Sequence, residues 1–448
     1  MLSGPRPTPK FMQNRHFWLL FAAAGLAFSM WFYVVHILVP YQIADAALQQ
    51  RPRGNLSDLY PRWLGARELW LHHRDPYGPE VTRDIQAGYY GRPLDPRRSR
   101  DPGDQQGFAY PVYVTFLLLP SLRMPFEEVR FGFTWLLVGL TACSVLLWLR
   151  ALRWIPRWQA TCAILLLTLG SFAALQGVKL QQLTLVVAAL VAACAALLTA
   201  GQFFAAGMLL AIATIKPQLV ALLSAFLMLW SWSDWRKRRG LFWGFILTLS
   251  LLFLGAQWLL PGWVGDFWQA LRRYQQYTGG QSRLDVLLGS ALGKGTAAAL
   301  VLGLALVSFR ARQAAENTED FILVFAAILV TTLLVMPNFA PYNELLLLPA
   351  ILLIAREIGN HRRPKGFRTL AAATGFFLSW GWIAAVGLTV ASLFVPASSL
   401  QQAWAIPLWS EFAIAPSVLV TLALLLKRML KPSSIPGREP AVVVTNGV

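Results

Sequence analysis

Five ionisable side chains lie within or beside long apolar runs of this 448-residue chain, at Asp58, Lys179, Lys216, Lys294 and Glu344. A charged group at membrane depth is costly, so such residues usually face a cavity or a partner and often serve function. One carboxylate with several cations would suit a lipid-linked phosphate. The cations can hold the phosphate while the carboxylate takes a proton from an attacking hydroxyl. These five residues are therefore the first candidates for chemistry.

Two of these candidates have simple structural alternatives. Asp58 could only cap a helix over residues 59–71, because an Asp side chain can accept a hydrogen bond from a free backbone N–H of the first turn. Lys179 lies in a turn between two apolar runs and could extend to the membrane interface without binding anything. Both alternatives stay open on the sequence alone.

The other three candidates differ in how strongly their surroundings favour function. Lys216 precedes a proline that interrupts an apolar run. Broken helical backbone at membrane depth is tolerated where it lines a cavity, so a functional role is favoured there. Lys294, between two glycines, favours neither interpretation. Glu344 lies in a turn where it can cap a helix or pair with a cation as readily as react.

The composition indicates which kind of element must position these residues. Apolar residues make up 56% of the chain, charged residues 13%, and mean hydropathy is +0.51. Soluble domains carry about 25% charged residues. This difference excludes an ordinary cytosolic enzyme and a disordered protein, and it favours one polytopic membrane domain. The net charge of +18 is then better explained by basic residues that set the membrane orientation than by binding of nucleic acid.

Twelve apolar runs are long enough, or nearly so, to be helical spans of about 20 residues. An Ala-x-Ala sequence follows the first run, but this run is longer than a signal-peptide core, so we interpret it as an uncleaved anchor. Three runs are short and could be bent or paired half-helices. The expected spans are 17–40, 127–150, 158–177, 180–199, 203–215, 217–232, 240–260, 285–308, 320–336, 341–356, 367–395 and 404–426.

Basic residues orient this threading, because roughly three times as many lie in its short inner connections as in its short outer ones. The bias predicts both termini in the cytoplasm and the long first loop, residues 42–110, outside. We therefore expect a single membrane domain over 17–430 in the inner (plasma) membrane. Cytoplasmic tails, 1–16 and 431–448, would flank this domain.

The first outer loop is unusually acidic and contains its own helical pattern. Leu59, Trp63, Ala66 and Trp70 recur at helical spacing, which predicts a helix with one apolar face. Such a helix would lie flat at the outer interface. The segment 111–122 is apolar but short and contains two prolines, so we expect it to dip into the membrane without crossing.

The sequence predicts no metal centre and no disulfide framework. All three cysteines lie inside apolar runs, at Cys143, Cys162 and Cys194. His72 and His73 are adjacent, and adjacent residues on a helix point in different directions. No Gly-rich phosphate loop, HExxH or GxSxG motif occurs. The expected chemistry requires no cofactor, although Asp101 and Asp104 leave room for a divalent cation.

Five segments, in order, resemble the motifs of glycosyltransferase family 87, the polyprenol-phosphate-mannose-dependent mannosyltransferases. The first, 57-SDLYPRWLGARELWLHHRDPYGPE-80, resembles the family's first-loop motif of an Asp, an aromatic-rich helix and a PY turn. The others are 108-FAYPVYVTFLLLPSL-122, 176-QGVKLQQLTLVVAAL-190, 207-GMLLAIATIKPQLVALL-223 and 336-MPNFAPYNELLLLPAILL-353. Val112 stands where a second Pro is common, and Gln181 and Gln182 stand where the family has Gly-Gln.

The resemblance implies an all-α, C-class (GT-C) glycosyltransferase fold with about 12 transmembrane helices and a long first extracytoplasmic loop. It also implies that the first-loop Asp is the catalytic base, which corresponds to Asp58. The KPQ segment would lie near the donor phosphate, which assigns that role to Lys216 and Gln218. Lys179 and Lys294 are further candidates for contact with the phosphate.

The late turn departs from the family pattern. It contains Tyr342, Asn343 and Glu344 where mannosyltransferase members often have His or Asp. These three residues are the candidates for a second polar group in the site.

The resulting hypothesis is an inverting transfer of a hexose, with mannose favoured, from a polyprenyl phosphate to a hydroxyl of a glycolipid or glycan. The site would face the extracytoplasmic side, with membrane lipid as a partner and no nucleic acid. The main rival is a non-enzymatic transporter or flippase of lipid-linked sugars. Transporters usually contain internal repeats and a site near the midplane, and this sequence shows neither pattern. A ligase or polymerase that acts on lipid diphosphates is a third class.

Overall fold

The computed structural model describes residues 10–52, 54, 57–95, 97, 98, 100–358 and 365–430. Helices, turns and loops make up these residues, and no named strand occurs among them. The expected tail 431–448 and most of the tail 1–16 lie outside the described residues. The expected all-helical polytopic architecture is confirmed.

Six helical segments of the described chain are long and apolar enough to cross a membrane. The number is seven if α7 (Trp158–Leu169) and α8 (Phe172–Lys179), which are bent by 54° at their junction, form one broken span. Several other expected spans correspond to helices of 10–17 residues, among them α9 (Leu183–Thr199), α10 (Phe203–Ala213) and α11 (Pro217–Ser233). A count of about 12 spans and the C-class fold therefore stay predictions.

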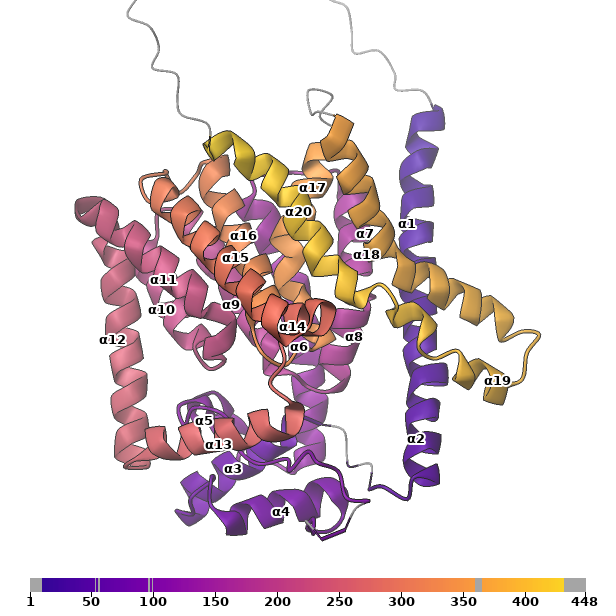
Figure 1. Ribbon diagram of the computed structural model, residues 1–448, viewed down its shortest axis with the longest axis vertical. Helices are drawn as coiled ribbons and strands as arrows, with labels where there is room; N and C mark the ends of the chain where they lie inside the picture. The colour runs from indigo at the N-terminus through magenta and orange to yellow at the C-terminus, as the bar shows by residue number, and fades with distance from the viewer. Residues whose placement is uncertain are drawn as a thin grey trace, which may run out of the picture.

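The described part of the chain begins with a continuous helical rod made of α1 (Lys10–Phe32), η1 (Tyr33–Leu38) and α2 (Val39–Leu48). The expected first span, 17–40, is part of it. Figure 1 shows this rod at the edge of the molecule, with α2 beside α19 (Ala397–Gln402). The Tyr33 hydroxyl donates a hydrogen bond to the carbonyl of Trp404 at 2.6 Å, and Tyr41 stacks on the Trp404 ring. The N-terminal rod is thus packed against the segment that precedes α20.

The remaining helices form the bundle and the cap across one of its ends. The cap comprises α3 (Tyr60–His72), α4 (Pro79–Tyr90), α5 (Val114–Leu118), η2 (Leu119–Ser121) and α13 (Trp263–Thr278). The other elements are α6 (Phe126–Ala151), α12 (Trp235–Leu259), α14 (Arg283–Leu288), α15 (Ser290–Ala311), α16 (Glu319–Val335), η3 (Pro341–Leu347), α17 (Leu348–Ile358), α18 (Lys365–Ala391), η4 (Ile406–Leu408) and α20 (Glu411–Leu430).

The core of the bundle contains two helices that are apolar on every side. Nearly all residues of α9 and α16 are buried, which matches sequences without a polar stripe. Elsewhere, small residues bring backbones together, as expected for helices in lipid. A Cβ atom added at Gly207 of α10 would lie 2.2 Å from the carbonyl oxygen of Leu241, and one at Gly244 of α12 would lie 2.1 Å from that of Phe204. The α10–α12 pair therefore requires glycine at both positions.

The two ends of the bundle have different elements. Figure 1 shows the start of α1 and the end of α20 at one end, and the helices α3, α4 and α13 at the other. Tryptophan side chains of α3 hold the elements of the cap to one another. Trp63 donates through Nε1 to the Ser121 carbonyl at 3.1 Å, and Trp70 donates to Thr115 Oγ1 at 3.0 Å. The expected apolar stripe of α3 is thus covered by protein, since Leu59, Trp63 and Ala66 are all buried.

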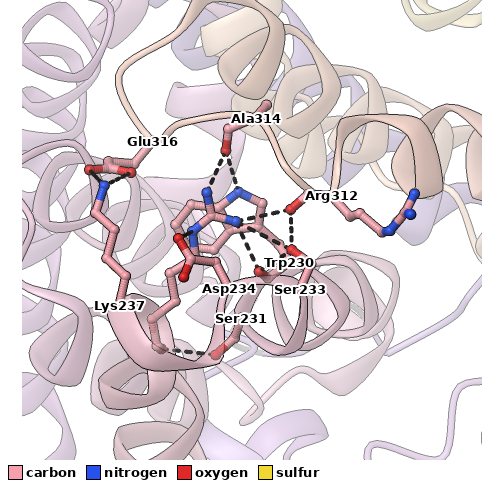
Figure 2. Close-up of polar contacts among 9 residues, drawn as sticks. Trp230, Ser231, Ser233, Asp234, Lys237, Arg312, Ala314 and Glu316 are labelled. Atoms are coloured by element: carbon pink, nitrogen blue, oxygen red, sulfur yellow. Dashed lines mark hydrogen bonds and ion pairs between the residues drawn. The ribbon is translucent and has the colours of Figure 1, made fainter.

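A polar cluster at the other end fastens the α11–α12 turn to the α15–α16 loop. The Arg238 guanidinium lies 3.8 Å over the Trp230 ring and donates to the carbonyls of Trp230, Arg312 and Ala314 at 2.9–3.1 Å. Figure 2 shows Lys237 reaching Glu316 at the rim of this cluster, where their closest distance is 2.7 Å. Because its donors are bound to fixed backbone carbonyls, the cluster acts as a clasp between two loops. It is called the Arg238 clasp below.

Candidate active site

A cavity of about 410 Å³ lies between the cap and the bundle. Its walls come from the start of α3, the loop before α5, the residue before α9, the start of α11, the inner face of α13 and the turn of η3. The lining residues used below are Asp58, Arg62, Asp104, Tyr110, Gln182, Lys216, Gln218, Tyr274, Tyr342 and Asn343. Segments far apart in the sequence therefore meet at this one place.

Asp58 lines this cavity from the turn that precedes α3. Its backbone N–H donates to the Leu180 carbonyl at 2.9 Å, which fixes the turn against the segment between α8 and α9. Its carboxylate accepts a hydrogen bond from Gln182 Nε2. The residue at the N-cap of α3 is Leu59, and no side chain caps the helix there. The alternative in which Asp58 only caps the helix is therefore wrong.

Burial shifts the acid–base behaviour of Asp58. Removal from water disfavours the carboxylate and raises the pKa of Asp58 above its usual value, and the charge of Asp104 acts in the same direction. The cations Arg62 and Lys216 and the Gln182 amide partly oppose this rise. A carboxyl with a raised pKa remains a stronger base once it is deprotonated, which suits proton removal from a hydroxyl.

Lys216 enters the same cavity from the break between α10 and α11. The residue is the N-cap of α11, directly before Pro217, and it is buried. Its ammonium donates to Gln182 Oε1 at 2.8 Å and to Thr184 Oγ1 at 2.7 Å. An ammonium has three donors, so two such bonds leave one for a ligand. The rings of Tyr110 and Tyr342 lie 5.7 and 5.4 Å from Nζ, within the range of cation–π contacts.

Arg62 is a second cation in the cavity, which the sequence analysis did not select. It lies one turn after Asp58 and donates through a terminal nitrogen to the Asp58 carbonyl at 2.5 Å. Its guanidinium lies 4.6 Å over the Tyr110 ring, and its Nε has no hydrogen-bond partner. The available signal was the four-residue spacing from Asp58, which places both residues on one side of a helix.

Tyrosines of the cap complete the polar wall. Tyr274 of α13 lines the cavity, and burial raises the pKa of Tyr274 to about 12. The hydroxyl therefore stays neutral near pH 7 and can donate a hydrogen bond. The signal for α13 was its amphipathic pattern, with Phe267 and Leu271 on the face that lines the cavity.

The three candidates for a second polar group, Tyr342, Asn343 and Glu344, all lie in η3 but face different surroundings. Tyr342 and Asn343 line the cavity, and Asn343 Oδ1 accepts a hydrogen bond from Thr184 at 3.0 Å. Glu344 does not line it. Its carboxylate instead pairs at 2.6 Å with Arg283, whose side chain is fully buried. Of the alternatives for Glu344, the structure shows pairing.

The other expected phosphate contacts separate in space. Gln218 lines the cavity and is exposed within it. Lys179 lies outside the cavity lining and donates to Gln42 Oε1 at 3.3 Å. Lys294 is exposed on α15, also outside the lining, and its charge acts on Asp285. The structure thus brings together Asp58, Lys216 and Gln218 but not these two lysines.

The two acids considered for a divalent cation have protein partners. Arg92 donates to Asp101 at 2.9 Å, and this interaction lowers the pKa of Asp101 to about 2. Asp104 accepts from the backbone and side-chain nitrogens of Gln106 at 3.0 and 2.6 Å. His72 lies 3.2 Å from Glu68. Among the described residues, no group of three or more His, Cys, Asp or Glu side chains is arranged to hold a metal ion.

The apolar helical bundle defines a polytopic membrane protein, and its polar cavity is the candidate site. The family model of glycosyltransferase family 87 matches residues 108–337, which is about half of the chain. The chain therefore belongs to this family, and the expected resemblance is confirmed. No curated protein and no solved structure matches the chain significantly. Lys216 lies within the matched segment, whereas Asp58 precedes it, so contacts in the cavity are what connect them.

Proposed function

We propose that the protein transfers a hexose, with mannose as the first candidate, from a polyprenyl phosphate to a hydroxyl of a glycolipid or glycan. The observation that carries the proposal is that Asp58 and Lys216 line one cavity, with a single amide between them. The family membership supports glycosyl transfer. The identity of the donor, the sugar and the acceptor is part of the proposal.

The chemistry follows from the roles of these two groups. The acceptor hydroxyl attacks the anomeric carbon of the donor while Asp58 takes the hydroxyl proton. A new C–O bond forms, the bond from the anomeric carbon to the phosphate oxygen breaks, and the configuration at the anomeric carbon is inverted. Polyprenyl phosphate leaves with the bonding electron pair, and Lys216 holds the charge on it. The catalytic requirements are position, proton removal and charge stabilisation, so this scheme needs no metal.

The cavity wall supports a lipid-linked donor. Beside the polar groups, α11 and α13 contribute Leu219, Ala221, Phe267, Trp268 and Leu271 to the lining. An isoprenoid chain can lie against such a wall while its phosphate reaches Lys216. Arg62, with its unpartnered Nε, is positioned to contact the same phosphate.

The proposal also includes an extracytoplasmic site. The cavity is lined by residues of α3 and α13, and Figure 1 shows these helices at the end of the bundle opposite the start of α1 and the end of α20. With the basic residues favouring cytoplasmic termini, the cavity would open outside. In a chain without its three cysteines, cysteine at Arg97 should react with an impermeant reagent in intact cells, whereas cysteine at Arg236 should not. Labelling at Arg236 alone would reverse the orientation.

The test of activity uses purified protein with polyprenyl-phosphate hexoses and a lipid extract, followed by mass spectrometry. We expect a product heavier by one hexose and release of polyprenyl phosphate. The Asp58→Asn protein should form this product on the order of 10²- to 10⁴-fold more slowly. Movement of intact labelled donor across a vesicle membrane without any product would instead support the rival transporter. That rival is less well supported, because the ionisable residues of the cavity gather at one end of the bundle rather than at its middle.

A further inference from the structure

Gln182 lies between the two groups that the proposed function uses. It directly precedes α9, it is 3% exposed, and its backbone N–H donates to the Gly177 carbonyl at 2.8 Å. Its side chain reaches both partners at once. Nε2 donates to Asp58, and Oε1 accepts from Lys216 at 2.8 Å.

Only one orientation of this amide satisfies both partners. Lys216 is a donor without acceptor capacity, and an ionised carboxylate is an acceptor without donor capacity. The amide oxygen must therefore face Lys216 and the amide nitrogen must face Asp58. A flipped amide would set donor against donor and acceptor against acceptor. The network thus defines the orientation of Gln182 and, through it, the separation of the two charged groups.

We propose that Gln182 is a positioning residue that holds the Asp58 carboxylate and the Lys216 ammonium apart in one fixed geometry. The inference rests on the proposed function. The bridge occupies one carboxylate oxygen, Oδ2, and leaves Oδ1 to accept the proton of the acceptor hydroxyl. It also prevents a direct Asp58–Lys216 ion pair, which would neutralise the base and hold the ammonium away from the phosphate.

The bridge also affects when Asp58 is charged. The groups that act on Asp58 come from several elements: Arg62 of α3, Lys216 before α11 and Asp104 of the cap loop. The tyrosines on which the charge of Asp58 acts are Tyr89 and Tyr90 of α4, Tyr274 of α13 and Tyr342 of η3. In addition to these groups, the Gln182 amide donates a hydrogen bond to the ionised Asp58 carboxylate. Loss of that bond should shift the pH at which Asp58 deprotonates upward.

The neighbouring Gln181 provides a matched control. It is also 3% exposed, but its amide nitrogen donates to the carbonyls of Val178 and Lys179 at 2.9 and 3.0 Å. It does not line the cavity. Methionine at either position keeps an unbranched side chain of similar length and removes the amide. A purely structural need for a buried amide would therefore affect both variants alike.

The experiment compares the wild type with Gln182→Met, Gln182→Glu and Gln181→Met. Transfer rates from polyprenyl-phosphate hexose are measured across pH. For Gln182→Met we expect kcat to fall on the order of 10- to 100-fold. The acid limb of the pH–rate profile of this variant should move to higher pH by about one to two units, since the Asp58 carboxylate loses a hydrogen bond. Gln182→Glu places a second carboxylate beside Asp58 and should move the limb further, while Gln181→Met should keep the wild-type profile.

Infrared titration of the Asp58 carboxyl, with Asp58→Asn as the subtraction reference, reads the same shift without turnover. An upward shift in Gln182→Met but not in Gln181→Met supports the bridge. Equal titration of the wild type and Gln182→Met overturns it, even if transfer is normal. Lack of transfer by the wild type, or normal transfer by folded Asp58→Asn, would overturn the proposed function instead. The two failures are thus distinguishable.

Discussion

Two buried sites in this protein bring acidic and basic side chains together in opposite ways. Arg283 and Glu344 pair directly at 2.6 Å, with no water-exposed surface on the arginine side chain. In the cavity, an amide separates Asp58 from Lys216. A direct pair neutralises both charges, whereas the separated groups each keep capacity for a ligand. Under the proposed function, the first site would maintain structure and the second would serve the reaction.

The largest effect that tests this comparison is loss of the base. Asp58→Asn keeps the size of the side chain but removes the proton acceptor, so turnover should fall on the order of 10²- to 10⁴-fold. Donor binding and thermal unfolding should change little, because the cations of the cavity remain. Transfer assays, donor binding and unfolding are measured on the same preparation. A folded variant with wild-type turnover would contradict the catalytic role.

The direct pair should respond in the opposite manner. Glu344→Gln removes the carboxylate that pairs directly with the buried Arg283 guanidinium and leaves Glu411 as an acidic neighbour, so the free energy of unfolding should fall by up to about 3–5 kcal/mol. Loss of a partner from a buried pair is costly because the remaining charge is not compensated. Unfolding by denaturant in detergent measures the change. The double variant Arg283→Met with Glu344→Gln should recover most of the loss, and a stable single variant would show that the pair is not structural.

Removal of the cavity cation should mainly weaken donor binding. Lys216→Ala removes one of two cations, Lys216 and Arg62, that line the cavity, and loss of a charge-assisted hydrogen bond predicts a Kd higher by on the order of 10- to 100-fold. Lys216→Arg should recover part of the affinity, although its planar fork is not equivalent to an ammonium. Lys237→Ala, at the other end of the bundle, is the control. Equal donor affinity in Lys216→Ala and the wild type would reduce this lysine to a structural role.

The sequence predicted the separate parts of the site better than their assembly. Asp58 and Lys216 stood out because charge is costly beside apolar runs, and the structure places both in the cavity. Gln182 carried no such signal, because a polar residue shows its importance only when residues 58, 182 and 216 are close in space. Lys294 had the same signal as Lys216 but is exposed on α15. Local patterns identify an unusual residue, whereas tertiary packing decides what the residue faces.

The fold shows the same limit. Most expected spans match helices, since a long apolar run has few alternatives in lipid. The expected span 341–356 is instead a 3₁₀ turn, η3, followed by the short helix α17. Pro341 and the polar residues after it indicated a turn, but hydropathy alone extended the span across them. The same turn provides both Asn343 to the cavity and Glu344 to the buried pair.

The smallest expected effect concerns the ion pair at the rim of the Arg238 clasp. Lys237 and Glu316 lie 2.7 Å apart, but the lysine is half exposed, so solvent screens the pair. Exposed ion pairs contribute about 0–1 kcal/mol, and Lys237→Ala should change the free energy of unfolding by no more than this.

Arg238→Met is the contrasting variant, because the guanidinium is buried and binds three backbone carbonyls that would lose their donor. Denaturant unfolding of both variants, with transfer activity as the second measurement, compares them. We expect Arg238→Met to lose more stability than Lys237→Ala, with donor affinity per folded molecule unchanged in both, because the clasp lies at the end of the bundle opposite the cavity. A loss of stability in Lys237→Ala as large as that in Arg238→Met would show that the rim pair, rather than the buried guanidinium, holds the two loops together.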